Sequence, residues 1–591
     1  MKPGAPMLEE KQAQFYDFGP FRLDETARVV LRENEVVPLT VKAFEILAHL
    51  VRHRGQVVSK EVLIKHVWPD CFVEENNLSQ NISALRRALA DDPENPKYIE
   101  TIPRRGYRFV GPVRELQTHP VPPIAAAGAR VGRIRSLAVL PFQSIGSANV
   151  EFLDVGLADA LITKLGNLEQ IEVRPTGSIL RYKGAAPNWV QAGSELNVDA
   201  LLHGCVQLSG DKIRVTVQLV AAGDGVTLWA GQFDEAFTDI FSVEDSISQQ
   251  VARTLMIRLS NEQRERLSHR YTSSPEAHQA YLRGRHFWNR RTEADLQKSV
   301  RCFQEAVAHD PSYALAYAGL ADSYTVLGGY GVLPPGDSYT RARAAAMQAL
   351  EIDERLAEAH TSLGDVSMYY DWRAPAAEQR YLRAIELRPD YATAHHFYAW
   401  FLIAKGDFAG ASAEMQRAQE LDPLSPMINT TRGFPDYFAG DFERAITHIQ
   451  KALDMDPEFA LAQVYLGRAY LCSGRHELGL ETIRQAARPS EMRPMMLAAL
   501  GHALAINRKK TEAKEIASQL IALRDTRYVS AYYIASVFAG LGDADRAFEW
   551  LERAFEDRVN QMVILHRDPL WARIAEDPRM SGIVRRVGFL G

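Results

Sequence analysis

The stretch from about residue 74 to residue 89 carries side chains that can read DNA bases. Apolar residues recur along it at helical spacing, and polar residues fall roughly opposite them. The polar face consists of Asn76, Gln80, Ser83 and Arg87. Asn, Gln and Arg can each bond two atoms of one base edge, and the major groove admits the helix that carries them. The pattern predicts a base-reading helix, and the plain alternative is a helix that is solvated on one side.

A group of arginines follows this stretch, between residues 101 and 109. Arg104, Arg105 and Arg108 lie around Gly106, a residue that favours a bend between two strands. Guanidinium groups on such a hairpin can meet phosphate oxygens and fix the register of the protein on the duplex. We therefore expect the hairpin to bind the DNA backbone while the helix reads bases.

Two more helices are predicted before the reading helix, and they must hold it in place. Residues 41–53 have a helical apolar period, with Thr40 as a plausible N-cap and Gly55 as a stop. Ser59 can cap the next helix, which continues to Trp68. Three helices followed by a hairpin form the pattern of a winged helix.

Residues 15–113 resemble the OmpR/PhoB-type winged-helix effector domain. The stretches that carry the resemblance are VPLT (37–40), GQVVSK (55–60), VW (67–68), NISALRRAL (81–89) and IETIPRRGYRF (99–109). The resemblance implies a small antiparallel sheet before the helices, and residues 15–18, 21–23 and 28–31 fit its strands. It also implies double-stranded DNA as the partner and binding as a homodimer on two half-sites. Together with the helical pattern, it implies phosphate contacts from Lys60, Arg86 and Thr101 besides the three hairpin arginines.

Members of that family usually carry the winged helix after a phosphorylatable receiver domain. Here only about 14 residues precede it, so we expect no phosphorelay control in cis. The net charge of −6 gives no general attraction to nucleic acid. Residues 15–113 contain 14 Lys and Arg against 14 Asp and Glu, so DNA affinity must come from a local basic face.

Cysteine usage and hydropathy indicate a cytoplasmic protein. Cys71, Cys205, Cys302 and Cys472 are scattered without a CxxC pair, which gives neither a disulfide framework nor a zinc site. No segment offers the 18 to 20 or so uncharged apolar residues that a membrane span needs. CadC-like and ToxR-like regulators carry such an anchor after the winged helix, whereas residues 114–135 here are rich in Pro and Ala and fit a soluble linker.

Residues 136–260 are predicted to form a compact mixed α/β domain, because strands first alternate with helices and then pair as hairpins. The domain resembles the TolB amino-terminal-like domain through VLPF (139–142), FLDVGL (152–157), GCV (204–206) and LWA (228–230). It has no nucleophile elbow, zinc spacing or phosphate loop. We therefore expect a sensing module without catalytic residues, metal or cofactor, in which His203 is a hydrogen-bonded core histidine.

Residues 275–556 carry a 34-residue period of small side chains. The positions on this period are Ala377, Ala411, Ala445, Gly479, Ala513 and Ala547, with Gly433, Gly467 and Gly501 twelve residues before three of them. The period is the tetratricopeptide (TPR) signature and predicts an α-solenoid of seven or eight repeats. The breaks at Asp310-Pro311, Pro389-Asp390, Asp422-Pro423 and Asp456-Pro457 predict helices that start at proline. Residues 557–591 are expected to cap the last repeat.

The solenoid's groove is where we expect a protein or peptide partner. Tyr391, His395, His396 and Trp400 suggest an aromatic inner stripe, and packing between repeats is an equally good explanation. Adjacent histidines point to different helix faces, so a metal site there is not expected.

The predicted fold class is therefore multi-domain α+β: an N-terminal winged helix-turn-helix, a central mixed α/β domain and a C-terminal all-α TPR solenoid. The leading functional hypothesis is a one-component transcription regulator, in which the solenoid and the α/β domain receive a signal and the winged helix binds a promoter. The alternative is an interaction scaffold whose winged helix docks protein, which predicts no sequence-selective DNA binding. A hydrolase or cyclase in the central domain has no supporting constellation.

Overall fold

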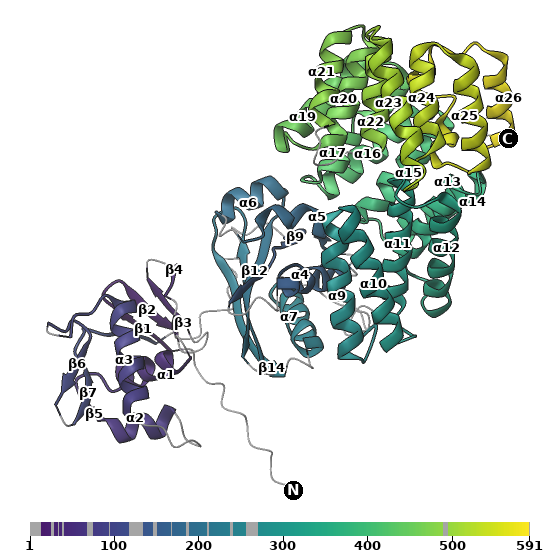
Figure 1. Ribbon diagram of the computed structural model, residues 1–591. Coiled ribbons are helices and arrows are strands. Elements are labelled where there is room, and N and C mark those ends of the chain that lie inside the picture. The colour runs from purple at the N-terminus through teal and green to yellow at the C-terminus, as the bar shows by residue number, and fades with distance from the viewer. Residues whose placement is uncertain are drawn as a thin grey trace. The chain divides into compact units, whose positions relative to one another are not determined.

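The computed structural model describes residues 14–24, 29–32, 35–37, 39, 41–67, 75–93, 95–103, 105–117, 134–145, 151–166, 168, 170–184, 188–209, 212–236, 240–255, 270–487 and 494–589. The chain divides into two compact units, residues 1–132 and residues 133–591 (Figure 1). Each unit is described by itself.

The first unit has the predicted winged-helix architecture. Its elements are β1 (Gln14–Phe18), β2 (Phe21–Asp24), β3 (Val29–Arg32), β4 (Glu35–Val36), α1 (Val41–Arg52), β5 (Val57–Ser59), α2 (Lys60–Val67), α3 (Glu75–Leu89), β6 (Ile99–Ile102), β7 (Gly106–Phe109) and β8 (Arg114–Gln117). One sheet has the order β4-β3-β2-β1-β8 and the other has the order β5-β7-β6. The three predicted helices and the predicted hairpin, β6 and β7, are all present.

Two hydrogen-bonded features of the first unit explain where α2 begins and why β8 is a strand. The Ser59 hydroxyl accepts a hydrogen bond from the Val62 amide at 3.3 Å, which confirms the predicted cap of α2. Strand β8 lies in the stretch that the sequence assigns to the linker, yet it pairs with β1 along four residues. Only this pairing makes residues 114–117 a strand, because they show no apolar alternation. The remainder of the expected linker, up to residue 133, lies outside the described residues.

The second unit begins with the central α/β domain. Its elements are β9 (Ser136–Val139), β10 (Gln143–Ile145), α4 (Glu151–Leu165), β11 (Glu172–Val173), α5 (Thr176–Ile179), α6 (Trp189–Leu196), β12 (Ala200–Ser209), β13 (Lys212–Ala221), β14 (Thr227–Ala236) and α7 (Ile240–Thr254). The sheet order is β11-β9-β12-β13-β14, with β10 also paired to β12. β9 lies parallel to β11 and β12, whereas β12, β13 and β14 form an antiparallel meander, as the alternating pattern predicts.

His203 lies on β12 and is only partly the core histidine that the sequence suggests. Its ring stacks on Trp189 with the ring centroids 3.8 Å apart. Burial lowers the pKa of this imidazole to about 4, so the ring is neutral. Its Nε2 atom is buried and has no hydrogen-bond partner among the described residues. His203 is therefore half-buried, and the hydrogen bond expected of it is not found at Nε2 among the described residues.

The rest of the second unit is the predicted TPR solenoid. Its helices are α9 (Pro275–Arg290), α10 (Glu293–His309), α11 (Ala314–Gly329), α12 (Pro335–Ile352), α13 (Ala357–Tyr369), α14 (Ala374–Leu387), α15 (Ala392–Lys405), α16 (Phe408–Leu421), α17 (Pro426–Thr431), α18 (Phe434–Ala439), α19 (Phe442–Met455), α20 (Ala460–Cys472), α21 (His476–Ala486), α22 (Pro494–Ile506), α23 (Lys510–Leu523), α24 (Ala531–Leu541) and α25 (Ala544–Glu556). Counting α17 and α18 as one broken helix, the described residues form eight antiparallel pairs. We call the first helix of each pair an inner helix, since inner helices of successive repeats pack on one another.

The 34-residue period marks the places where the helices of a pair come closest. The five alanines on the period are fully buried. A Cβ on Gly467 would lie 2.4 Å from Ile483 Cγ1 and 2.8 Å from the carbonyl oxygen of Gly479. In the repeat that has glycine instead of alanine, two backbones are thus nearly in contact, and Gly433 comes similarly close to the Ala445 carbonyl oxygen, at 2.9 Å from its Cβ position.

At the four breaks named above, the prediction that the next helix starts at the proline of the break is wrong, although other repeat helices, such as α9 and α12, do start at a proline. At the first break, α10 ends at His309, and α11 begins only at Ala314. The Asp310 carboxylate accepts the Ser312 amide at 2.9 Å, which makes a turn that occupies the proline position. Proline has a different effect within α17 and α18, where Pro435 cannot donate to the preceding turn and breaks the inner helix.

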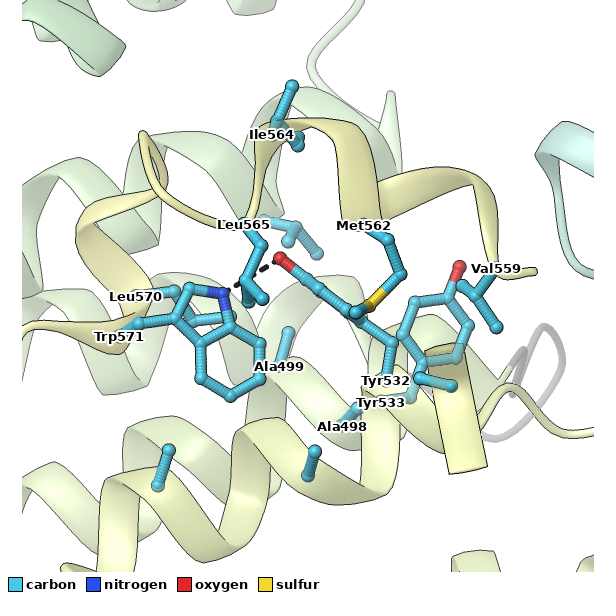
Figure 2. Close-up of a cluster of buried hydrophobic side chains, with 14 of the residues drawn as sticks. Ala498, Ala499, Tyr532, Tyr533, Val559, Met562, Ile564, Leu565, Leu570 and Trp571 are labelled. Atoms are coloured by element: carbon cyan, nitrogen blue, oxygen red, sulfur yellow. Dashed lines mark hydrogen bonds between the residues drawn. The ribbon is translucent and has the colours of Figure 1, made fainter. Parts of the chain in front are cut away.

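The segment after α25 does more than cap the last repeat. It contains two short 3-10 helices, η5 (Asn560–Ile564) and η6 (Pro569–Trp571), and then α26 (Pro578–Val587). η5 packs against the inner helices α13 and α15, and η6 packs against α20 and α24. Figure 2 shows Trp571 with its indole N–H directed at the hydroxyl of Tyr532, at 2.9 Å. The segment after α25 therefore covers part of the surface formed by the inner helices, which we call the inner face.

The central domain also contacts the solenoid. The Arg285 guanidinium on α9 donates two hydrogen bonds, of 2.9 and 3.1 Å, to the buried Asp159 carboxylate on α4. Arg417 on α16 donates to Glu172 on β11 at 2.9 Å, and Ser178 donates to the buried Asp422. These contacts explain why the domain and the repeats form one compact unit.

The aromatic stripe of the fourth repeat serves packing, the second of the two explanations considered. Trp400 packs edge-on against Phe434 and Phe438 of the next repeat, with centroids 5.1 and 5.9 Å away. His396 is buried and its Nε2 lies 3.0 Å from the Thr431 hydroxyl. His395 is also buried, with Nδ1 2.6 Å from Glu414. No group of metal-ligating side chains occurs in the part of the chain that the structure describes.

Candidate nucleic-acid interface

α3 presents the predicted polar face. Its opposite face is fully buried in the core of the first unit, through Leu78, Ile82, Leu85 and Leu89. Ser83 and Arg87 are exposed, and the Ser83 hydroxyl donates to the Ser79 carbonyl at 2.9 Å. Asn76 and Gln80 belong to α3, but their side chains lie outside the described residues. Two of the four candidate base-reading side chains are therefore placed, both on the solvent face.

The hairpin of β6 and β7 places Arg105 in its exposed turn. The Arg105 amide donates to the Ile102 carbonyl at 3.0 Å and closes the turn. Gly106 has φ = +150°, and a Cβ there would lie 2.0 Å from the Val58 carbonyl oxygen of β5. Glycine is thus required for β7 to pair with β5. This pairing fixes the position of the β6–β7 hairpin, which is the wing of the winged helix. Arg104 lies outside the described residues.

Three of the predicted phosphate ligands already make hydrogen bonds within the domain. Arg108 donates from Nε and Nη2 to one oxygen of Glu100, at 2.8 and 2.6 Å. Arg86 donates from Nη2 to the Ile99 carbonyl at 2.8 Å and to the Thr101 hydroxyl at 2.7 Å. Arg86 therefore joins α3 to the wing, and Lys60 is half-buried at the start of α2.

Asp91 is a structural residue of this site that the sequence analysis did not identify. Its buried carboxylate accepts three backbone amides at the root of the wing, from Lys97 (2.6 Å), Tyr98 (3.1 Å) and Ile99 (2.8 Å). Burial, and then the Asp91 charge, raise the pKa of the Tyr98 hydroxyl. An aspartate just after a helix, followed by a strand, is the signal that could have indicated this role.

The site has the chemistry of a binding surface. It offers hydroxyl and guanidinium groups on a helix and cations on a hairpin, held together by Asp91 and Arg86. The free cysteines that the structure describes, at positions 205, 302 and 472, all lie in the second unit. None of the helices that the structure describes is long and apolar enough to span a membrane.

Family models match three parts of the chain. Residues 34–109 match the family described as "Transcriptional regulatory protein, C terminal". Residues 133–250, which include most of the TolB-like stretch, match the second domain of HilA/YgeH-like transcriptional regulators. Residues 373–426 and 436–491 match the tetratricopeptide repeat. Fold, site and family models define a transcriptional regulator that carries an OmpR/PhoB-type DNA-binding winged helix and TPR repeats.

One relative is similar over most of its length. The transcriptional regulator HilA of Salmonella typhimurium is 25% identical over 414 residues, which cover 69% of this chain and 71% of HilA. A shorter match, 28% identical over 234 residues, is to a protein named putative adenylate cyclase 3 of Rhizobium meliloti, and it covers 39% of each chain.

Solved structures are similar over small parts of the chain. The DNA-binding domain of Escherichia coli CadC is 30% identical, covering 18% of this chain and 98% of that domain, with a TM-score of 0.16. The Klebsiella pneumoniae RstA DNA-binding domain in complex with the RstA box is 28% identical, covering 16% of this chain and 96% of that chain, with a TM-score of 0.15.

Proposed function

We propose that the protein regulates transcription by binding promoter DNA with α3 in the major groove and the wing on the backbone. The observation that carries the proposal is the exposed face of α3, where Ser83 and Arg87 stand opposite a fully buried stripe. Asn76 and Gln80 would complete the base-reading set.

Phosphate binding would fall mainly to Arg104 and Arg105, with Lys60 at the start of α2 as a further contact. Arg105 is exposed in the turn, where its guanidinium can reach a phosphate. Arg86 already donates to the Thr101 hydroxyl, and Arg108 is paired with Glu100, so we expect these three to contribute less to phosphate binding.

Selection of random duplexes by the full chain at about 150 mM salt tests the base-reading role. We expect an enriched motif that the Arg87→Ala chain no longer selects. Arg585→Ala removes the same charge from an exposed position on α26 and should leave the motif unchanged. An Arg87→Ala chain that enriches the same motif would reject α3 as the reading helix. No enrichment by the unaltered chain would favour the scaffold alternative.

The salt dependence of affinity tests the phosphate role. Loss of one phosphate contact reduces the slope of log K against log salt by about 0.9. We expect Arg105→Ala to reduce the slope by about that amount for every sequence and to leave the selected motif intact. An unchanged slope would show that Arg105 makes no phosphate contact.

We further propose that two copies bind neighbouring half-sites, because a single winged helix buries a modest surface. The enriched motif should then be repeated at intervals of about 10 to 10.5 base pairs. The repeats and the central domain would bring a signal from a protein or peptide partner, in the cytoplasm and without catalysis. Such a partner would bind beside the covered part of the inner face.

A further inference from the structure

Three histidines meet where α1 packs on α2. The ring of His49 stacks on that of His53, with centroids 4.3 Å apart, and lies against that of His66, at 4.2 Å. His49 lies on α1, His53 is the residue just after α1, and His66 lies in the last turn of α2. His49 is 9% exposed, whereas the other two rings are exposed to solvent.

A second proton on His49 would lack a hydrogen-bond acceptor at Nδ1, which is buried and has no partner among the described residues. Nδ1 of His53 lies 2.8 Å from the His49 carbonyl oxygen and donates to it. The groups that act on the charge of His49 are Arg52 at the end of α1, His53 just after it and His66 on α2, and none of these is acidic. α3 and β7, which also pack on α1, add no charged group to this set.

We propose that His49, His53 and His66 form a pH-sensitive joint between α1 and α2, which loosens when His49 takes up a proton. A protonated His49 would be a buried cation near Arg52, and its Nδ1–H would have no acceptor among the described residues. α1 and α2 both pack on α3, so a looser joint would no longer hold the reading helix. The DNA affinity of the protein would then fall in acid. This inference rests on the proposed DNA binding.

The direction of the effect follows from the titration of His49. Burial, followed by His66, His53 and Arg52, lowers the pKa of His49 from its ordinary 6.5 to about 4. A histidine with a lowered pKa in the folded state stabilises the fold fully above pH 6.5 and loses that contribution as the pH falls toward 4. The fold should therefore weaken between these two values.

The test measures the affinity of the full chain for its selected duplex from about pH 7.5 to about pH 4, with a chelator present. Hydrogen exchange of residues 41–67, corrected for the intrinsic effect of pH, is followed in the same range. We expect the unaltered chain to lose about tenfold or more in affinity and to lose protection in α1 and α2. His49→Phe keeps a ring of similar size and should remove most of both changes.

His66→Gln is the second variant, since its ring is exposed and its loss spares the core. His476→Gln, an exposed histidine of α21, is the control and should behave as the unaltered chain. The proposal is overturned if the unaltered chain keeps its protection in acid, or if both His49→Phe and His66→Gln lose affinity as it does. The exchange of α1 and α2 is read without DNA, so failure of the proposed DNA binding would be seen separately, as no binding at any pH.

Discussion

Gly106 is the residue on which the wing most depends. Its φ is +150°, and a Cβ at this position would lie 2.0 Å from the Val58 carbonyl oxygen, which excludes any side chain. Asp91 and Arg86 act nearby by hydrogen bonding, because one gathers three amides and the other joins α3 to the strand beside it. α3 and the wing are thus positioned by hydrogen bonds that form within the domain itself.

Gly106→Ala should lower the free energy of unfolding of the winged helix by about 2 kcal/mol or more, because the backbone must move away from β5. Gly55→Ala is the matched control. Gly55 also has a positive φ, of +77°, but nothing lies within 4 Å of its Cβ position, so only about 1 kcal/mol of backbone strain is expected. Denaturant unfolding of the two variants measures the difference, and equal losses would mean that the approach to Val58 costs nothing.

At the scale of elements, the close pairing of α20 with α21 depends on two glycines. Gly467 and Gly479 let the helices approach until each glycine's Cβ position lies within 2.8 Å of the other's carbonyl oxygen. The alanines of the other pairs keep a methyl group at this position. The small residues on the 34-residue period therefore mark the positions where the two helices of a repeat lie close together.

Gly467→Ala should lower the melting temperature of the repeats, since the added methyl overpacks the pair at a cost of about 1 to 3 kcal/mol. Gly329→Ala is the control, because Gly329 is also helical and has open space at its Cβ position. That variant should melt at the unaltered temperature or slightly above it. Calorimetry measures the melting temperatures of both variants. A Gly467→Ala chain with an unchanged melting temperature would show that the two helices can move apart without loss of stability.

At the scale of the whole molecule, the second unit is held together by contacts between segments that are distant in the sequence. The central domain bonds to α9 and α16, and the segment after α25 returns to α13 and α15. Trp571 is 1% exposed and anchors this segment against Tyr532. The end of the chain thereby stabilises helices nearly two hundred residues before it.

Trp571→Ala should destabilise the second unit by about 3 to 5 kcal/mol, because it empties a filled site and removes the bond to Tyr532. The protection of α13 and α15 against hydrogen exchange should fall as well, although both are remote in sequence. Trp571→Phe keeps most of the aromatic ring. It should lower the stability of the second unit only by the contribution of the hydrogen bond to Tyr532, about 1 kcal/mol. Protection that falls only in α24 and α26 would contradict a role of the segment in closing the repeats.

The sequence by itself determined most of the elements and the exposed face of α3, because their signals are local. The apolar stripe of α3, the cap at Ser59, the glycine of the wing and the 34-residue period each depend on neighbours along the chain or on a fixed repeat. The assignment of α3 as a helix with Ser83 and Arg87 on its solvent face follows from periodicity alone.

Only the tertiary structure decided which charged groups are already engaged and which surfaces are covered. Arg108 and Glu100 lie eight residues apart and meet because β6 pairs with β7. The three histidines meet because α1 packs on α2. Part of the inner face is covered because the segment after α25 packs against α13 and α15. Contacts of this kind depend on the packing of segments distant in sequence, and no local pattern records them.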